Sequence, residues 1–393
     1  MPGLPPFRGP VSPATTRTTR PTTTGTRQWR VALASTALLL ALLTTTAHAA
    51  EVRLCVGAGP LFPETAEGLR NAVVKMLDEA QAPEPTRPLL ATLVPHGPYG
   101  ISGKVAASAF KHLKKGQFDR VIVLGASHAE AAFQGCSIAA VDAYATPMGL
   151  VPVDGKSVRK LCYSALFNTR SLRYPHLQRG FLTESDRKPL HEFEHSIEAV
   201  LPFLQEQLGS FELVPILVGE LTDGSDRYNE MRTRAVASII RDIMDEKTLL
   251  VVSSDFVHFG NDFGYRPFNT DIFQRIDRLD EAGLQQLAAN DLAGFEEFLK
   301  ATKAPICGLN ALRVLMQLLP DRARGQLLAR TTSGQFYDNP ERSISYAAMN
   351  FYLSDESQRP KVVAPPEPEE KVIPKATDKA PVTLSNTGGR GLE

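Results

Sequence analysis

The chain has 393 residues, of which 43% are hydrophobic and 22% are charged, an ordinary composition for a globular protein with a sizeable core. Lys plus Arg and Asp plus Glu number 43 each, so the formal net charge is zero. That balance argues against a basic nucleic-acid-binding surface and against an acidic tail protein. Four cysteines in this length do not make a disulfide scaffold, and the composition excludes a coiled coil, a collagen and a polytopic membrane protein.

The N-terminal segment has the features of a secretory signal peptide. It has no acidic residue before Glu51, and its arginines are Arg8, Arg17, Arg20, Arg27 and Arg30. The apolar run Val31–Leu43 follows, and then the small-residue site Ala47-His48-Ala49. This run is too short to cross a bilayer, so we predict cleavage after Ala49 and a periplasmic or secreted protein. The alternatives are an uncleaved N-terminal anchor and an assigned start that lies upstream of the true one.

The C-terminal segment is predicted to be disordered. It has few hydrophobic residues among its lysines, glutamates and prolines, and the prolines are Pro360, Pro365, Pro366, Pro368, Pro374 and Pro381. Such a composition cannot bury enough apolar surface to offset the entropy of ordering. The sequence therefore predicts three parts: a signal peptide or anchor at 1–49, a folded domain at 50–353 and a disordered tail at 354–393.

The middle of the chain alternates strand and helix patterns. Strands are predicted at Leu89–Val94, Asp119–Leu124, Leu213–Val218, Thr248–Val252 and Ser343–Phe351. Helices are predicted at Gly103–Leu113, Ser196–Leu208, Tyr228–Met244, Asp271–Leu287, Asp291–Thr302 and Leu309–Leu319. This order is typical of a single α/β domain with a mainly parallel central sheet flanked by helices.

Histidines follow three of the predicted strands. His96 comes after the first strand, His128 after the second, and the segment with Asp255 and His258 after Thr248–Val252. Ligands of open α/β sheets bind outside the carboxyl ends of the strands, so these side chains are expected to share one site. Imidazoles with a carboxylate or thiolate would make an open metal site, and an Asp–His pair suits a general base.

Cys307 is a further candidate ligand. It lies in a turn that opens the predicted helix Leu309–Leu319, and a helix N-terminus lowers the pKa of a thiol. The alternatives are a small buried residue and one half of a disulfide with Cys55, Cys136 or Cys162.

A competing motif, His191-Glu192-Phe193-Glu194-His195, matches the H-E-x-x-H signature of zinc proteases. Pro189 lies just before it, and the apolar periodicity begins only at Ile197, so the segment resembles the entrance of a helix more than its middle. We keep the zinc protease as a minor alternative, beside hydrogen bonds of Glu194, His195 and Ser196 at the helix start.

Seven ordered motifs of the chain resemble those of the MEMO family, which is also called AmmeMemoRadiSam system protein B in bacteria. They run from about Gly59 to Phe351, nearly the whole predicted domain. The segments are Pro95–Gly103, Gly125–His128, Thr146–Asp154, Glu194–Leu204, Ser253–Gly260, Ile306–Gly308 and Ser345–Ala347.

The resemblance implies a fold similar to that of class III extradiol dioxygenases of the LigB type, which are non-haem iron enzymes. It implies metal ligands at His96, His128 and Cys307, with Asp255 and His258 lining the same pocket. In an enzyme we expect His258 to act as the catalytic acid or base beside Asp255. Cysteine takes the position of a carboxylate ligand of the dioxygenases. A thiolate is softer than a carboxylate, so iron or copper is expected, with zinc as an alternative.

The chain departs from the family pattern at four places. Gly97-Pro98 replaces Ala-Gly, and Ala126 replaces Pro. Ile101 replaces a pocket Tyr, and Leu309 replaces the usual Arg after Cys-Gly. The last two changes remove polar groups that could bind an anionic substrate.

The sequence supports two hypotheses about the function of the protein. One is an exported metal protein with oxidoreductase chemistry on O₂, and the other is a protein that binds metal or peptide without turnover. The expected ligand is a small molecule or a peptide, with no nucleic acid and no membrane contact beyond an N-terminal anchor.

Overall fold

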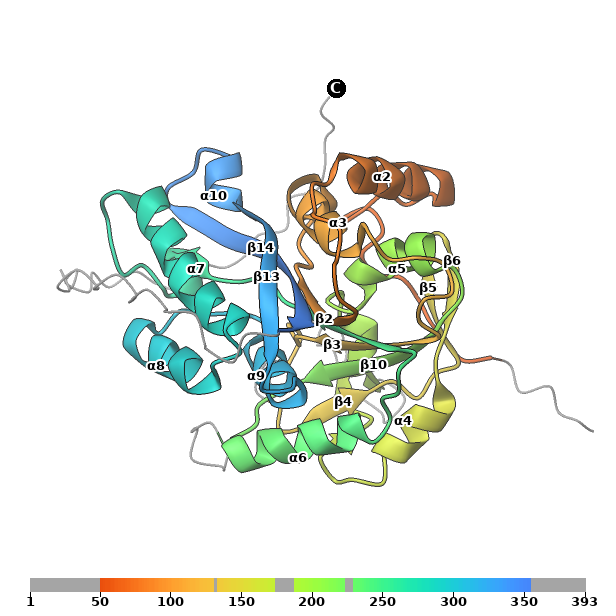
Figure 1. Cartoon of the computed structure of the whole chain (residues 1–393). Helices are drawn as coiled ribbons and strands as arrows, with labels where there is room; N and C mark the ends of the chain where they lie inside the picture. The colour runs from red at the N-terminus through yellow and green to blue at the C-terminus, as the bar shows by residue number, and fades with distance from the viewer. Residues whose placement is uncertain (1–49, 131–132, 174–186, 223–228, 355–393) are drawn as a thin grey trace, which may run out of the picture. The chain divides into compact units, whose positions relative to one another are not determined.

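A mixed sheet forms the centre of the structure, a computed structural model that describes residues 50–130, 133–173, 187–222 and 229–354 (Figure 1). Among these residues the sheet has nine strands. In spatial order eight of them are β12 (His258–Gly260), β14 (Arg342–Leu353), β2 (Leu89–Val94), β11 (Thr248–Ser253), β3 (Arg120–Gly125), β10 (Glu212–Val218), β4 (Cys136–Ile138) and β7 (Phe167–Asn168). The ninth, β13 (Ala323–Thr332), pairs with β14.

The four central strands, β2, β11, β3 and β10, are parallel to one another. Their runs of Leu, Val and Ile are buried, as expected for parallel strands covered on both faces. The predicted parallel arrangement is therefore correct for the centre of the sheet. Outside it the sheet is mixed, because β14 runs antiparallel to β2, β12 and β13, and β4 runs antiparallel to β10.

Helices cover the sheet on both sides (Figure 1). One group contains α2 (Ala66–Glu79), α3 (Lys104–Phe110) and α5 (Leu201–Leu208), which contact one another. The other contains α6 (Glu230–Arg241) and α9 (Leu309–Leu318), with α9 against β10 and β11. The other α-helices of the described residues are α4 (Gly155–Leu161), α7 (Ile272–Ala288), α8 (Leu292–Thr302) and the short α10 (Ser333–Phe336).

Polar side chains fix where several helices begin. Thr65 accepts a hydrogen bond from the Gly68 N–H at the start of α2. Asn229 and Asp291 accept equivalent bonds at the starts of α6 and α8. Such caps satisfy backbone donors that have no partner inside the helix, and each contributes about 1 kcal/mol.

Two small sheets lie outside the central one. The first joins β1 (Val52–Arg53), β5 (Ala143–Thr146) and β6 (Gly149–Pro152), and the second joins β8 (Ser171–Arg173) and β9 (Arg187–Pro189).

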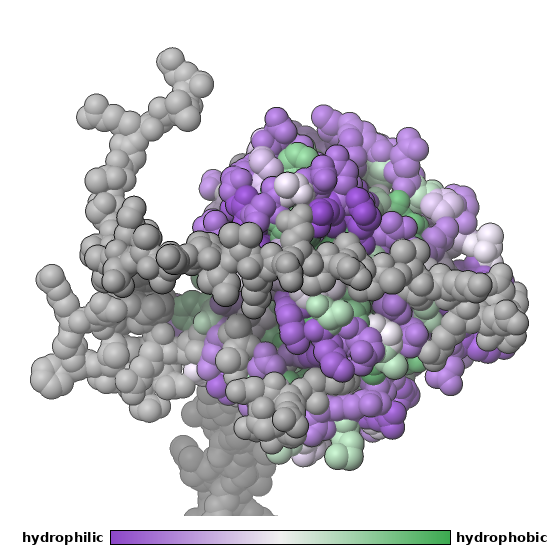
Figure 2. Space-filling model, turned by 90° about the vertical axis from the view of Figure 1, so that its left-hand side faces the viewer, coloured by the Kyte–Doolittle hydropathy of each residue, from purple (hydrophilic) through white to green (hydrophobic). Residues whose placement is uncertain are grey.

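The described part of the chain contains no helix that is long and apolar enough to cross a membrane. On the face seen in Figure 2, hydrophilic residues predominate and hydrophobic ones are scattered in small groups. The predicted signal segment, 1–49, and nearly all of the predicted tail lie outside the described residues.

Candidate metal centre

The carboxyl ends of three neighbouring parallel strands bring the predicted site residues together. His96 follows β2, His128 follows β3 and Asp255 follows β11. Cys307 reaches the same place from the loop before α9. Residues far apart in the chain thus meet at one edge of the sheet, as predicted from the strand ends.

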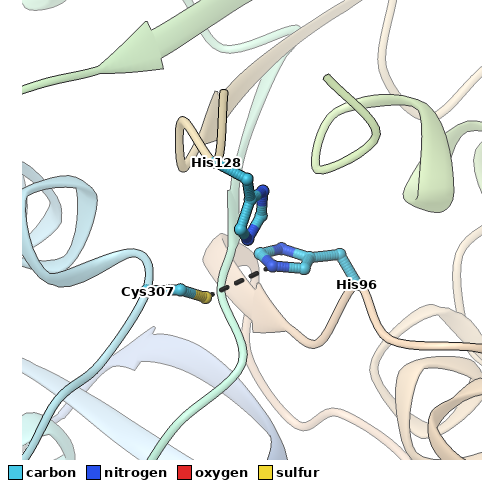
Figure 3. Close-up of side chains that lie close together, drawn as sticks. All are labelled: His96, His128 and Cys307. Atoms are coloured by element: carbon cyan, nitrogen blue, oxygen red, sulfur yellow. Dashed lines mark hydrogen bonds between the residues drawn. The ribbon is translucent and has the colours of Figure 1, made fainter. Parts of the chain in front are cut away.

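Two imidazoles and a thiol converge at this edge (Figure 3). The Cys307 Sγ atom lies 3.2 Å from Nε2 of His96. The rings of His96 and His128 meet edge to face, with their centroids 5.1 Å apart. One donor atom from each of the three residues lies within 4.8 Å of the other two, a spacing that fits coordination of a single ion.

A chain of hydrogen bonds fixes the tautomer of His96. Its Nδ1 lies 3.0 Å from the Ser253 Oγ, and that hydroxyl donates its own proton to the backbone carbonyl of Ser196. The hydroxyl must therefore accept a hydrogen bond from Nδ1–H of His96. The Nε2 atom is then unprotonated, and its lone pair faces Cys307. The imidazole is buried, and this burial, with the charges of His128 and His258, holds its pKa well below the usual value.

Glu194 orients His128 in the same manner. Its carboxylate accepts a hydrogen bond from Nδ1 of His128 at 3.0 Å and also binds the backbone N–H groups of His128 and Ala129. The Nε2 atom of His128 is thereby left free to bind an ion. Burial lowers the pKa of His128, but the hydrogen bond and charge of Glu194 outweigh it and raise the pKa overall.

We expect Glu194→Gln to weaken metal binding by about 10–100-fold, because the carboxylate that orients His128 is lost. The measurement is a competition titration with a chromophoric chelator. Glu192→Gln is the matched control, since Glu192 lies two residues earlier, is partly exposed and pairs with Lys188. Equal affinities of the two variants would contradict the orienting role of Glu194.

The prediction that a helix N-terminus lowers the pKa of the Cys307 thiol is wrong for the metal-free protein. Burial raises this pKa strongly, and the nearby Asp255 raises it further. The neutral thiol is therefore the stable form until a cation displaces its proton. The disulfide alternative is also excluded in this structure, because Cys55, Cys136, Cys162 and Cys307 are all free.

Asp255 and His258 line the pocket beside these donors. Asp255 accepts a hydrogen bond from the backbone N–H of His96 at 2.9 Å, and burial raises the pKa of its carboxyl to about 6. The Nδ1 of His258 donates to the Phe256 carbonyl at 3.0 Å, which leaves Nε2 as a proton acceptor. Burial lowers the pKa of His258, so its ring is neutral at pH 7.

His195 also belongs to the pocket, although the strand-end argument did not include it. Its ring stacks on that of His128 with the centroids 4.6 Å apart, and burial lowers its pKa to about 4. His128, Glu194 and His195 form a second group with donor atoms within 4.8 Å, but the Glu194 carboxylate already accepts several hydrogen bonds. The Glu-His-Ser segment of the family motif was the signal that could have identified His195.

The two histidines of the H-E-x-x-H motif do not share a helix face. His191 lies in a 3₁₀ turn, Leu190–Phe193, and the backbone is extended at Glu194. His191 is buried, with Nδ1 2.6 Å from the Tyr144 hydroxyl, whereas His195 faces the pocket. This geometry lacks the one-turn spacing on a helix that a zinc protease needs.

The stability of the protein should fall as pH falls from about 6.5 towards 3, and His191 should carry part of this change. Burial lowers the pKa of His191 to about 3, whereas a histidine in the unfolded chain has a pKa near 6.5. Between these values the unfolded chain binds the proton and the folded chain does not, so acid favours unfolding by up to about 1.4 kcal/mol per pH unit.

Urea unfolding at about pH 7 and about pH 5 tests this dependence, with His191→Gln expected to reduce the slope. His112→Gln is the control, because His112 is a partly buried surface residue that contacts the Ala82 carbonyl. An unchanged slope in His191→Gln would show that other groups carry the acid sensitivity.

The sequence matches the family described as Memo-like protein over residues 53–350. It is 31% identical to "Protein memo-1 homolog" of Caenorhabditis elegans over 305 residues, which cover 74% of this chain and 80% of the relative. It is 28% identical to "Protein MEMO1" of Homo sapiens, with 74% of this chain and 94% of the relative covered. A solved structure of an uncharacterized Escherichia coli K12 protein covers 66% of this chain and 99% of its own, with a TM-score of 0.39 and 12% identity.

The family match spans the segments that carry His96, His128, Asp255, His258 and Cys307, and the structure brings these residues to one sheet edge. The resemblance of the motifs and the matches to whole relatives agree. The chain belongs to the Memo-like protein family.

Proposed function

We propose that this chain is an exported metal-binding protein that holds one copper or iron ion on His96, His128 and Cys307, with zinc as the alternative ion. The observation that carries the proposal is the convergence of the three donor atoms within 4.8 Å. Two neutral imidazoles and one thiolate leave room in the coordination shell for a further ligand. The signal-like sequence of residues 1–49 supports export.

Copper or iron, when bound, would supply a redox centre and a Lewis acid, whereas zinc would supply the Lewis acid alone. The residues of the chain would control protons around it. His258 would accept a proton at Nε2 from a bound ligand, because its Nδ1–H is held by Phe256. Asp255, whose pKa is about 6, would stabilise the imidazolium that results.

Oxidation of a small molecule by O₂ is the reaction that this set of groups supports best. A second candidate, metal binding without turnover, is favoured by Ile101 and Leu309, which stand where the family pattern has Tyr and Arg. Because those two groups could orient a substrate, their absence weakens the case for one particular reaction.

Elemental analysis of protein purified from its native compartment is the first test, followed by O₂-uptake assays with catechols. About one equivalent of copper or iron with O₂ consumption would support an oxidoreductase. The same metal content without turnover would support the binding protein. A folded protein that takes up none of the three metals would overturn the metal site.

Export is tested separately by cell fractionation and N-terminal sequencing. A chain that begins at Ala50 in the periplasm or medium would support a cleaved signal peptide. A chain that begins at Met1 in the cytoplasm would contradict export, whatever the metal content.

A further inference from the structure

One strand beside the pocket carries an arginine that the site described above does not use. In the antiparallel pair of β12 and β14, His258 lies opposite Ile344, and Gly260 lies opposite Arg342. Directly opposed residues point to the same face of a sheet, and so do alternate residues along one strand. Arg342, Ile344 and Tyr346 therefore share the face on which His258 lies.

The neighbours of β14 support this assignment of faces. The two serines between these residues, Ser343 and Ser345, are buried, and Ser343 accepts a hydrogen bond from the Gly334 N–H of α10 on the opposite face. On the pocket face, the Tyr346 ring fits against Gly97, next to His96: a Cβ added at Gly97 would lie 2.5 Å from a ring carbon. In this structure the absence of a side chain at position 97 leaves the space that the Tyr346 ring occupies.

The Tyr346 hydroxyl lies at the end of this face that is next to the predicted metal ligands. The residue is 2% exposed, and its hydroxyl makes no hydrogen bond with any residue of the described chain. Burial raises the pKa of Tyr346, with further contributions from the nearby Asp255 and Cys307, so the hydroxyl stays protonated. It is therefore a hydrogen-bond donor without a partner among the described residues, beside the predicted metal ligands.

Arg342 brings a positive charge to the outer end of the same face. Its guanidinium lies 4.9 Å from the centre of the Phe263 ring, and that ring lies 5.0 Å from the ring of His258. Its acidic neighbour, Asp262, is 3.5 Å away and 76% exposed, and the arginine side chain is 50% exposed. Such a surface pair contributes little, so the guanidinium can exchange Asp262 for an anion of a ligand.

We propose that the pocket takes a small organic carboxylate, whose anionic group binds Arg342 and whose second oxygen accepts a hydrogen bond from Tyr346 near the metal ligands. Tyr346 lies against Gly97, next to His96, and Arg342 lies against Phe263 at the outer end of the face, so the two groups would bind different oxygens of the ligand. The ligand therefore carries its two oxygen groups at opposite ends of a short rigid or chain-like body.

This inference rests on the proposed function, because it names the ligand class of the same pocket. Its test compares the binding of 4-hydroxybenzoate and of 4-hydroxybenzamide, which have one shape and differ in charge, to the full-length protein by calorimetry. The wild type should bind the carboxylate at least about tenfold more tightly than the amide, since a guanidinium–carboxylate pair is a charge-assisted hydrogen bond. Arg342→Gln should remove this preference, and Tyr346→Phe should weaken both ligands.

Arg234→Gln is the matched control, because Arg234 is an exposed arginine on α6 that pairs with Glu230. It should leave the preference unchanged. Equal binding of the two probes by the wild type, no binding of the carboxylate at millimolar concentration, or a preference that survives Arg342→Gln would each overturn the inference. Metal content measured on the same samples separates the two proposals: metal retained with no carboxylate preference would leave the metal site intact.

Discussion

The double variant His96→Ala, Cys307→Ala should lose its bound metal, whereas the wild type should retain about one equivalent. His96 Nε2 and Cys307 Sγ are 3.2 Å apart, and removing both leaves His128 as the only member of the predicted ligand set. A single exposed imidazole binds divalent ions too weakly to survive dialysis, so we expect at least about a thousandfold loss of affinity. Elemental analysis after dialysis against a weak chelator provides the measurement.

A matched control removes one histidine and one cysteine away from the pocket. His112→Ala, Cys162→Ala suits this purpose, since Cys162 is exposed at the end of α4 and His112 contacts the Ala82 carbonyl. This control should keep its metal. If the pocket variant retained metal with its circular dichroism spectrum unchanged, the ion would be held elsewhere, and the three-ligand site would be wrong.

Replacing Arg53 by Met should destabilise the fold by about 3–5 kcal/mol, because it leaves a buried carboxylate without its cation. Arg53 forms an ion pair with Glu198, and the two side chains are 1% and 0% exposed. Arg53 also donates hydrogen bonds to the backbone carbonyls of His191 and Glu194. The substitution should therefore weaken metal binding as well, through the backbone that carries Glu194.

Urea unfolding of the metal-free protein measures this effect. Arg234→Met is the control, because its i, i+4 pair with Glu230 is exposed, and a change of about 0.5 kcal/mol or less is expected. The double variant Arg53→Met, Glu198→Leu should recover part of the lost stability, since it removes the unpaired charge. A loss in Arg53→Met no greater than that of the control would contradict a buried ion pair.

The sequence predicted the central strands well because their signal is local. Leu89–Val94 is a short apolar run between a Pro-rich segment and Pro95, and β2 has the same bounds. The long strand β13 was missed, because Arg324, Gly325 and Arg330 interrupt the alternation of hydrophobic and polar residues. Its pairing with β14 depends on tertiary contacts that no local window contains.

The residues of the candidate site were also predictable from the sequence only in part. His96, His128 and Cys307 could be placed together because each follows an element whose end the sequence marks, and the family motifs agreed. Glu194 could not be assigned its role, because its partner, the loop at His128, lies 66 residues away in the chain. Tyr346 was likewise not assigned to the pocket: it lies in the motif Ser345–Ala347, but its place beside His96 follows from the packing of its ring against Gly97.

The three metal-ligating residues are far apart in the sequence, so metal binding is coupled to folding of the whole domain. His96 and Cys307 are 211 residues apart, so no fragment that ends before residue 307 contains the complete donor set. An ion that binds only the folded chain adds stability by mass action, about 4 kcal/mol at a free concentration a thousand times the dissociation constant. Bound metal would therefore stabilise the whole fold, and the melting temperature of the protein would rise with the free concentration of the metal.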